Sequence, residues 1–154
     1  MPTIGSSATV TIDRTANEVW EYVVDPAKLH SRVKDINSPG NWIGEGGPSV
    51  GSRYRVDYDY GRKTNEIIFE VTDSKPGTRF GTDTVEGLYP ISVEYTLSEV
   101  ANGESTELTI FMNARSDSTF TAILFVLTGW FAKSFMKKRL RRELSDLKQA
   151  IESV

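Results

Sequence analysis

The sequence predicts an α+β domain in which an antiparallel run of strands is followed by one long helix. Three observations favour this class. Segments of alternating apolar and polar residues follow one another between residues 52 and 112. A helical pattern then runs without interruption from residue 120 to residue 153. Two short helical segments follow the first strand, so strands and helices are segregated along the chain.

The first 32 residues predict one strand and two short helices. Residues 8–13 alternate apolar and polar side chains, as a half-buried strand does. Thr15 is followed three residues later by Glu18, which is the spacing of a capping box and indicates a helix start. A second short helix is expected at Pro26, since proline is tolerated in a first helical turn.

Five further strand patterns are joined by turns, after a Gly/Pro/Ser-rich loop over residues 33–50. The strand patterns occupy residues 52–60, 63–73, 79–86, 91–98 and 108–112. Pro76 and Gly77 stand at the two central positions of an expected type II turn. Asn102 followed by Gly103 is a strong hairpin signal.

The C-terminal helix carries two apolar stripes where a surface helix needs one. At 100° per residue, one core-facing stripe contains Ala122, Val126, Gly129, Met136, Leu140, Leu144, Leu147 and Ile151. A second stripe on the opposite side contains Phe120, Leu124, Leu127, Phe131 and Phe135. A helix that is apolar on both sides must be covered on both, by protein, lipid or a bound molecule.

Composition predicts one globular domain over residues 1–154, with 38% apolar and 25% charged residues. The chain has no cysteine, which excludes disulfides and thiolate chemistry and makes the reducing cytoplasm the expected compartment. The N-terminus lacks the pattern of a signal peptide. The apolar segment 120–131 is too short to span a bilayer, which takes about 20 residues.

The charge is distributed unevenly. The net charge is −3, but residues 133–142 contain six Lys or Arg and no acid, so the remaining residues sum to −9. A local basic cluster on an acidic protein argues against nucleic-acid binding, which favours a broadly basic face. The cluster is either a solvated helix face or a contact for an anionic headgroup, an acidic partner or a carboxylate ligand.

Two segments carry a resemblance to a known family. The opening VTIDRTANEVWEYVVDP and the glycine-rich NWIGEGGPSVGSRYR, followed by strands and a long terminal helix, resemble the START-like (SRPBCC) superfamily. Within it, the chain is most similar to bacterial polyketide cyclase/dehydrase and lipid-transport-like proteins, over residues 6–152. The resemblance implies a helix-grip fold, in which a curved antiparallel sheet wraps around the long helix. It also implies a cavity between them for an apolar or aromatic ligand.

On this resemblance, the inward faces of the strands and the helix supply the wall of the cavity. The candidate ligand-binding residues are Trp42, Tyr54, Val56, Tyr58, Ile67, Phe69, Phe80, Tyr95, Met112, Trp130 and Phe131. Each can equally be ordinary core, because protein interiors are close-packed. A tyrosine hydroxyl or Arg55 is expected to orient the ligand.

The sequence predicts no catalytic residue, metal site or cofactor. His30 is the single histidine, and it is expected to be exposed or to cap a helix. Gly47-Pro48-Ser49-Val50-Gly51 has the G-x-S-x-G spacing, but it stands in the Gly/Pro/Ser-rich loop, where no helix opens to form a nucleophile elbow. Alternation places the side chains of Asp57 and Asp59 outward. It does not decide on which face of the sheet Glu66 and Asp83 lie.

We therefore keep three hypotheses for the function, because members of one fold family differ in activity. The first is a carrier or sensor of a small hydrophobic molecule, a lipid or a polyketide-like aromatic. The second is a polyketide cyclase, aromatase or dehydratase. The third is an interaction module that docks through the C-terminal helix.

The second apolar stripe has two explanations. Either the short helices and the loop 33–50 cover it, through residues such as Trp20, Leu29 and Trp42, or it contacts a membrane or a second copy of the chain. In the latter case its basic flank would suit anionic lipid headgroups. That flank consists of Lys137, Lys138, Arg139, Arg141 and Arg142.

Overall fold

The computed structural model describes residues 3–31, 33, 36–60, 63–87, 91–115 and 119–153, without the side chains of residues 3, 4, 60, 115 and 119–135. Its elements are β1 (Thr3–Ile12), α1 (Ala16–Val23), the 3₁₀ helix η1 (Pro26–Ser31), β2 (Asn41–Ile43), β3 (Arg53–Tyr60), β4 (Lys63–Lys75), β5 (Arg79–Glu86), β6 (Ile91–Val100), the 3₁₀ helix η2 (Ala101–Gly103), β7 (Ser105–Arg115) and α2 (Thr119–Glu152). The predicted order of elements is confirmed, except that the loop predicted over residues 33–50 contains the short strand β2 and the second short helix is a 3₁₀ helix.

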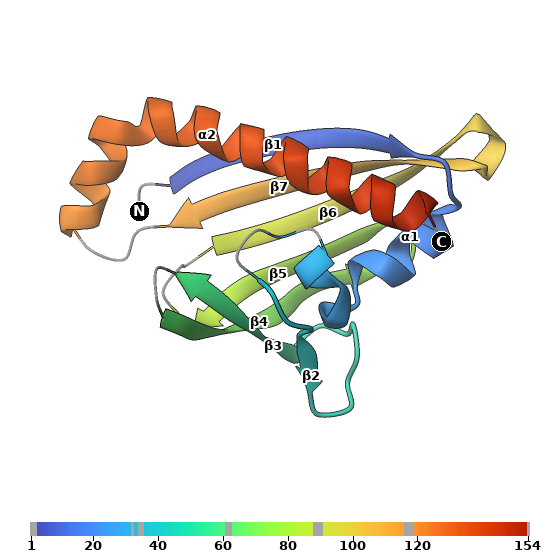
Figure 1. Ribbon diagram of the computed structural model, residues 1–154, viewed down its shortest axis with the longest axis horizontal. Helices are drawn as coiled ribbons and strands as arrows, with labels where there is room; N and C mark the ends of the chain where they lie inside the picture. The colour runs from blue at the N-terminus through green and yellow to red at the C-terminus, as the bar shows by residue number, and fades with distance from the viewer. Residues whose placement is uncertain are drawn as a thin grey trace.

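The strands form one antiparallel sheet in the order β1-β7-β6-β5-β4-β3-β2. The chain runs through the sheet as a meander from β2 to β7, and β1 closes the far edge by pairing with β7. Two register shifts in the β4–β5 pair, at Ile68/Phe69 and Val71/Asp73, bend the sheet. Helices α1 and α2 lie on the same face, and α2 runs along β1 (Figure 1). The predicted α+β helix-grip fold is confirmed.

The predicted helix cap and the predicted turn after β4 are both present in the structure. Thr15 caps α1, because its side-chain oxygen accepts a hydrogen bond from the backbone N–H of Glu18. At the turn after β4, the N–H of Thr78 donates to the carbonyl of Lys75 at 2.9 Å, and Gly77 has φ 73°. This positive φ is why glycine suits the position.

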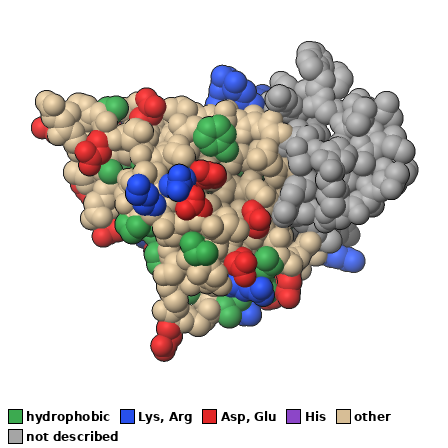
Figure 2. All heavy atoms as spheres, turned by 180° about the vertical axis from the view of Figure 1, so that it is seen from behind, with side chains coloured by type: hydrophobic (Ala, Val, Ile, Leu, Met, Phe, Trp, Pro, Cys, Tyr) green, Lys and Arg blue, Asp and Glu red, His purple; other side chains and the backbone are tan. Residues whose placement is uncertain are grey.

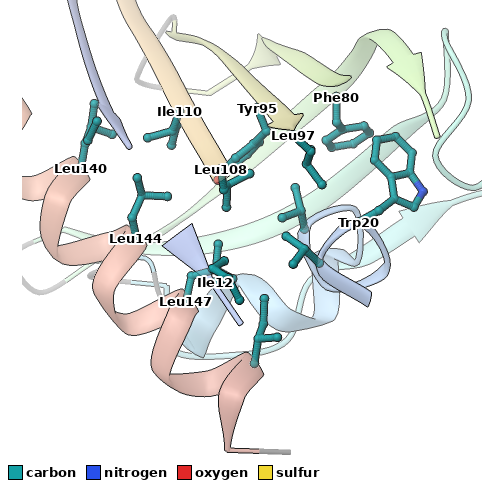
Figure 3. Close-up of a cluster of buried hydrophobic side chains, with 14 of the residues drawn as sticks. Ile12, Trp20, Phe80, Tyr95, Leu97, Leu108, Ile110, Leu140, Leu144 and Leu147 are labelled. Carbon is teal, nitrogen blue, oxygen red and sulfur yellow. The ribbon is translucent and has the colours of Figure 1, made fainter. Parts of the chain in front are cut away.

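The main hydrophobic core lies between the second half of α2 and the sheet. Three leucines project from α2 toward the sheet, and each is at most 2% exposed (Figure 3). They are Leu140, Leu144 and Leu147. They pack in one cluster with Ile12 and Ile110. The second half of the predicted core-facing stripe is therefore confirmed. Residues 122, 126 and 129 of that stripe lie outside the described side chains.

A second hydrophobic cluster covers the other end of the sheet. Partly buried side chains from η1 and the following loop contribute to it. Its buried members are Ile36, Tyr54, Val56, Ile67 and Phe69. Among the described residues, Trp42 packs against both clusters. The inner face thus has two packed regions.

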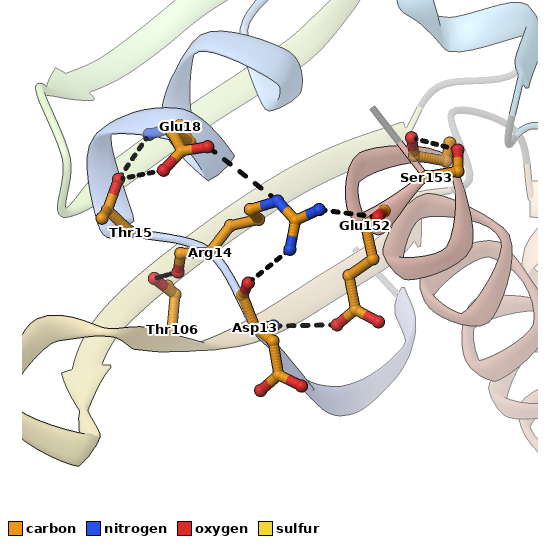
Figure 4. A network of polar contacts seen from close by, with 8 residues as sticks. Asp13, Arg14, Thr15, Glu18, Thr106, Glu152 and Ser153 are labelled. Atoms are coloured by element: carbon orange, nitrogen blue, oxygen red, sulfur yellow. Dashed lines mark hydrogen bonds and ion pairs between the residues drawn. The ribbon is translucent and has the colours of Figure 1, made fainter.

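The C-terminal end of α2 is tied to the end of β1 by polar contacts (Figure 4). The Arg14 guanidinium donates to the carbonyl of Glu152 at 2.6 Å and to that of Asp13 at 2.7 Å. The hydroxyl of Thr106, which is fully buried, donates to the carbonyl of Arg14 at 2.9 Å. The core and these contacts together fix α2 on the sheet.

Candidate ligand-binding site

The strand register identifies the inner face, which is the face toward α1 and α2. Tyr95 of β6 stands opposite Phe80 of β5 and Ile110 of β7, and directly opposite residues share a face. All three side chains are buried, and Trp20 of α1 meets Phe80 edge-on with ring centroids 5.8 Å apart. This part of the inner face is filled by protein.

Toward the end of the sheet where α2 begins, the inner face is less buried. We call this region the half-buried end; it comprises Tyr58, Thr84, Ile91, Val93 and Met112, each of intermediate exposure. Val93 stands opposite Met112, so their side chains are neighbours on one face. Figure 1 shows the first half of α2 at this end of the sheet. The half-buried end is thus a part of the described inner face where apolar side chains are only partly covered.

Thr82 lies at the boundary between the filled region and the half-buried end. It stands opposite Val71 of β4 and Val93 of β6, so it is flanked on both sides by apolar side chains. Thr82 is only 4% exposed, and its hydroxyl has no hydrogen-bond partner among the described residues. A buried hydroxyl without a partner costs free energy, so this oxygen marks a place for a polar atom beyond the described residues.

The neighbouring threonine differs. The Oγ1 of Thr84 accepts from the N–H of Ile91 and also lies within donating distance of its carbonyl, at 3.3 Å in each case. Thr84 thereby joins β5 to the start of β6. It holds Ile91 in place on the wall of the half-buried end.

The predicted site residues fall into two groups. Trp42, Tyr54, Val56, Tyr58, Ile67 and Phe69 belong to or pack on the second cluster. Tyr54 stacks on Phe69 with ring centroids 5.2 Å apart and meets Trp42 edge-on at 5.4 Å. Phe80, Tyr95 and Met112 belong to or pack on the main core. Trp130 and Phe131 lie outside the described side chains.

Three residues were missing from the prediction although they lie at or beside the half-buried end. Ile91 and Val93 could have been found, because they alternate with Tyr95 on the same strand. Thr82 carried no such signal, since threonine is common on either face of a strand. Only its neighbours on β4 and β6 reveal that its hydroxyl is buried.

The expectation that Arg55 orients a ligand was wrong. Arg55 lies on the outer face, where its Nε is 3.0 Å from a carboxylate oxygen of Glu66 and 45% of its side chain is exposed. Glu66 itself is therefore outward, and Asp83 shares the outer face with Ser92. His30 is exposed on η1. None of these groups faces the inner side of the sheet.

Two carboxyl groups on the surface have shifted pKa values. Hydrogen bonds from the Asn37 amide and the Thr64 hydroxyl lower the pKa of Asp59 below its usual value of 3.8. The hydrogen bond from the backbone of Asp13 lowers the pKa of Glu152 below 4.5, with Lys148 adding to the effect. Both carboxylates hold surface elements together, and neither lies in the candidate site.

The outer face carries a small groove of about 110 Å³. Gly81 forms part of its floor, because it has no side chain to fill the space between Asp73 and Glu94. Phe111, at 45% exposure, lines one side. Figure 2 shows the side of the molecule that is hidden in Figure 1, with charged side chains of both signs among scattered apolar ones. Most residues of the groove lie on the opposite side of the sheet from the predicted cavity, although Thr82 and Val93 also border it.

A family model described as polyketide cyclase / dehydrase and lipid transport matches residues 3–152. The chain belongs to this family. The resemblance seen in the sequence is therefore confirmed. No curated protein matches the sequence.

Solved structures of other proteins have the same fold. A START superfamily protein from Mycobacterium smegmatis is 15% identical, with a TM-score of 0.77 over 97% of this chain and 98% of that one. A protein from Thermus thermophilus is 16% identical, with a TM-score of 0.74 over 99% and 98%. The ZhuI aromatase/cyclase from Streptomyces sp. R1128 is 16% identical, with a TM-score of 0.68 over 98% and 94%. These likenesses establish the helix-grip fold. In the part of the chain that the structure describes, no helix is both long and apolar enough to cross a membrane.

Proposed function

We propose that the protein binds one small, largely apolar molecule at the half-buried end of the inner face and acts as its carrier or sensor. The observation that carries the proposal is the buried Thr82 hydroxyl beside the half-buried Val93 and Met112. A site for an apolar molecule with a single polar group requires an apolar wall and one polar atom that is left without a partner among the described residues.

The driving force of binding is burial of apolar surface, at about 25 cal/mol per Å². The hydroxyl of Thr82 sets the orientation, because it both donates and accepts hydrogen bonds. A carbonyl or hydroxyl of the ligand would satisfy it. The ligand class we propose is therefore a lipid or polyketide-like aromatic that carries a hydroxyl or carbonyl group.

Binding without chemistry is the function that the described wall supports best. On the inner face of β5, β6 and β7, the described side chains at positions 80–84, 91–97 and 106–114 are apolar, hydroxyl or phenol groups. These groups bind and orient a molecule, whereas proton transfer at neutral pH needs an acid or base of suitable pKa. The aromatase/cyclase among the structural relatives shares only the fold, and we place the cyclase, aromatase or dehydratase alternative second.

The predicted surface contact of α2 belongs to the same proposal. A carrier of an apolar molecule must meet the membrane or the protein that supplies it. The stripe Phe120, Leu124, Leu127, Phe131 and Phe135 stays a prediction, because these side chains lie outside the described residues. A homodimer through the same stripe is the alternative contact.

A matched pair of variants tests the binding site. Val93→Phe adds bulk to the half-buried end, whereas Val85→Phe adds the same bulk to the outer face of β5, where Val85 is 39% exposed. The probe is N-phenyl-1-naphthylamine, whose fluorescence rises in apolar surroundings. We expect saturable binding to the unmodified protein and to Val85→Phe, and a Kd at least tenfold higher for Val93→Phe. Equal affinity in all three proteins would refute the site.

A further inference from the structure

Five cations gather on one and a half turns of α2. We call them the basic strip: Lys137, Lys138, Arg139, Arg141 and Arg142, all exposed. Leu140 lies among them and is 2% exposed, because it packs into the main core. The buried side of this helical segment is thus anchored on the sheet. The strip covers the sides that face away from it.

The basic strip has no ion-pair partners among the described residues. The arginines of the sheet behave differently. Arg53 is paired with Glu70 at 3.0 Å, and Arg79 with Asp73. Like charges so close together repel each other within the folded protein, and no acid of the described residues offsets this repulsion. The five cations of the strip are exposed and can meet an external anion.

The charge of the whole chain narrows the choice of partner. Residues outside 133–142 sum to −9, so the strip is a local positive site on an acidic protein. Nucleic acids would be repelled by most of this surface. A flat anionic bilayer can be approached by the strip alone, with the acidic remainder turned away. The strip also follows directly on residues 120–131 of the same helix, a twelve-residue segment without a charged side chain.

We propose that the basic strip docks the protein on the surface of an anionic phospholipid bilayer. Clusters of this kind gain about 1 kcal/mol for each Lys or Arg at such a surface, provided that the charges remain within a Debye length. A helix with a basic face and an adjoining apolar segment is a common form of peripheral membrane anchor. The inference rests on the proposed carrier function for its purpose, but docking needs no ligand and is measured without one.

Co-sedimentation with lipid vesicles tests the proposal. The full-length protein is mixed with vesicles of phosphatidylcholine alone, or with 30% phosphatidylglycerol, at low and high salt. Lys138→Gln with Arg142→Gln removes two cations of the strip, on the line opposite the buried leucines. The control is Lys63→Gln with Lys75→Gln, which removes two exposed cations at the two ends of β4. Both double variants change the net charge equally.

We expect the protein to bind the phosphatidylglycerol vesicles at low salt and to be released from them at high salt. It should not bind vesicles of pure phosphatidylcholine. The strip variant should bind about 30-fold more weakly, which is about 1 kcal/mol for each of the two charges. The control variant should bind as the unmodified protein does. Equal losses in both variants, equal binding to neutral vesicles, or binding to a DNA duplex instead of vesicles would each overturn the proposal. Binding of N-phenyl-1-naphthylamine in the absence of vesicles tests the ligand site separately, so either idea can fail alone.

Discussion

The backbone N–H of Asp13 donates to a carboxylate oxygen of Glu152 at 2.8 Å (Figure 4). The two residues are 139 positions apart, and their contact joins the end of β1 to the last residue of α2. Lys148 donates to the same oxygen at 2.7 Å and to the carbonyl of Thr11 at 2.7 Å. The Glu152 carboxylate thus accepts hydrogen bonds both from the backbone after β1 and from a side chain of α2.

We expect Glu152→Gln to lower the midpoint of thermal unfolding by a few degrees at neutral pH. The pKa of Glu152 is lowered in the folded protein, so its contribution is fully present above its unfolded value of about 4.5. The contribution is lost as pH falls through the lower folded pKa. The difference between the two proteins should therefore shrink in acid. Glu107→Gln, an exposed change on β7, serves as the control; an equal effect there would contradict a specific role for Glu152.

Leu144→Ala should lower the free energy of unfolding by about 3 kcal/mol, because it leaves a cavity in the main core. Leu144 is 1% exposed and packs between α2 and the sheet. Ser145→Ala, at the next and exposed position, should change it by less than about 0.5 kcal/mol. Urea denaturation measures both. A loss below about 1 kcal/mol for Leu144→Ala would mean that this half of α2 is not packed on the sheet.

Two buried threonines should respond oppositely to the same substitution. Thr82→Val removes a hydroxyl without a partner among the described residues and should stabilise the ligand-free protein by about 1 kcal/mol. Thr106→Val removes a hydroxyl that donates to the carbonyl of Arg14, and should destabilise by about 1–3 kcal/mol. Equilibrium denaturation decides. Destabilisation by both changes would contradict an unsatisfied Thr82 hydroxyl in the ligand-free protein.

Thr82→Val should also separate two ligands of nearly equal shape. Naphthalene has no polar group, so its affinity for the variant and for the unmodified protein should agree within twofold. The affinity of 1-naphthol should fall about fivefold, which corresponds to one hydrogen bond of about 1 kcal/mol. Thr82→Ser keeps the hydroxyl and should restore the difference between the two ligands. Equal losses for both ligands would mean that Thr82 shapes the site without anchoring a polar group.

Tyr58→Phe should weaken retention of a bound ligand several-fold with little loss of stability. Tyr58 is half-buried at the edge of the second cluster, and the substitution keeps its ring. Native mass spectrometry of freshly purified protein compares the fraction with a bound molecule in the two proteins. The same occupancy in both would remove the tyrosine anchor from the account and leave Thr82 as the polar contact.

Much of the fold could be predicted because its signals are local. Thr15 caps a helix through its own side chain, and Gly77 supplies the positive φ of its turn. The periodicity of Leu140, Leu144 and Leu147 marks the buried face of α2 wherever the helix packs. Alternation likewise placed Tyr95 and Phe80 correctly on one face of the sheet.

The candidate site could be predicted only in part, because its limits depend on contacts between distant segments. Alternation cannot tell which inward side chains are covered by other elements. Tyr54 and Val56 are buried because Ile36 and the loop around it pack over them. Gly40 allows this close approach, since a Cβ there would lie 2.8 Å from the carbonyl oxygen of Arg55. The burial of Thr82 likewise follows from pairing across three strands.

Nuclear Overhauser effects between N-phenyl-1-naphthylamine and protein methyl groups test the central claim most directly. The proposed site predicts contacts from the probe to the methyls of Ile91, Val93 and Met112 on the inner face. It predicts none to Val85 and Thr109, whose side chains lie on the outer face. Contacts confined to the outer face, or saturating probe binding without any contact to the three inner methyls, would contradict a ligand site between the sheet and α2.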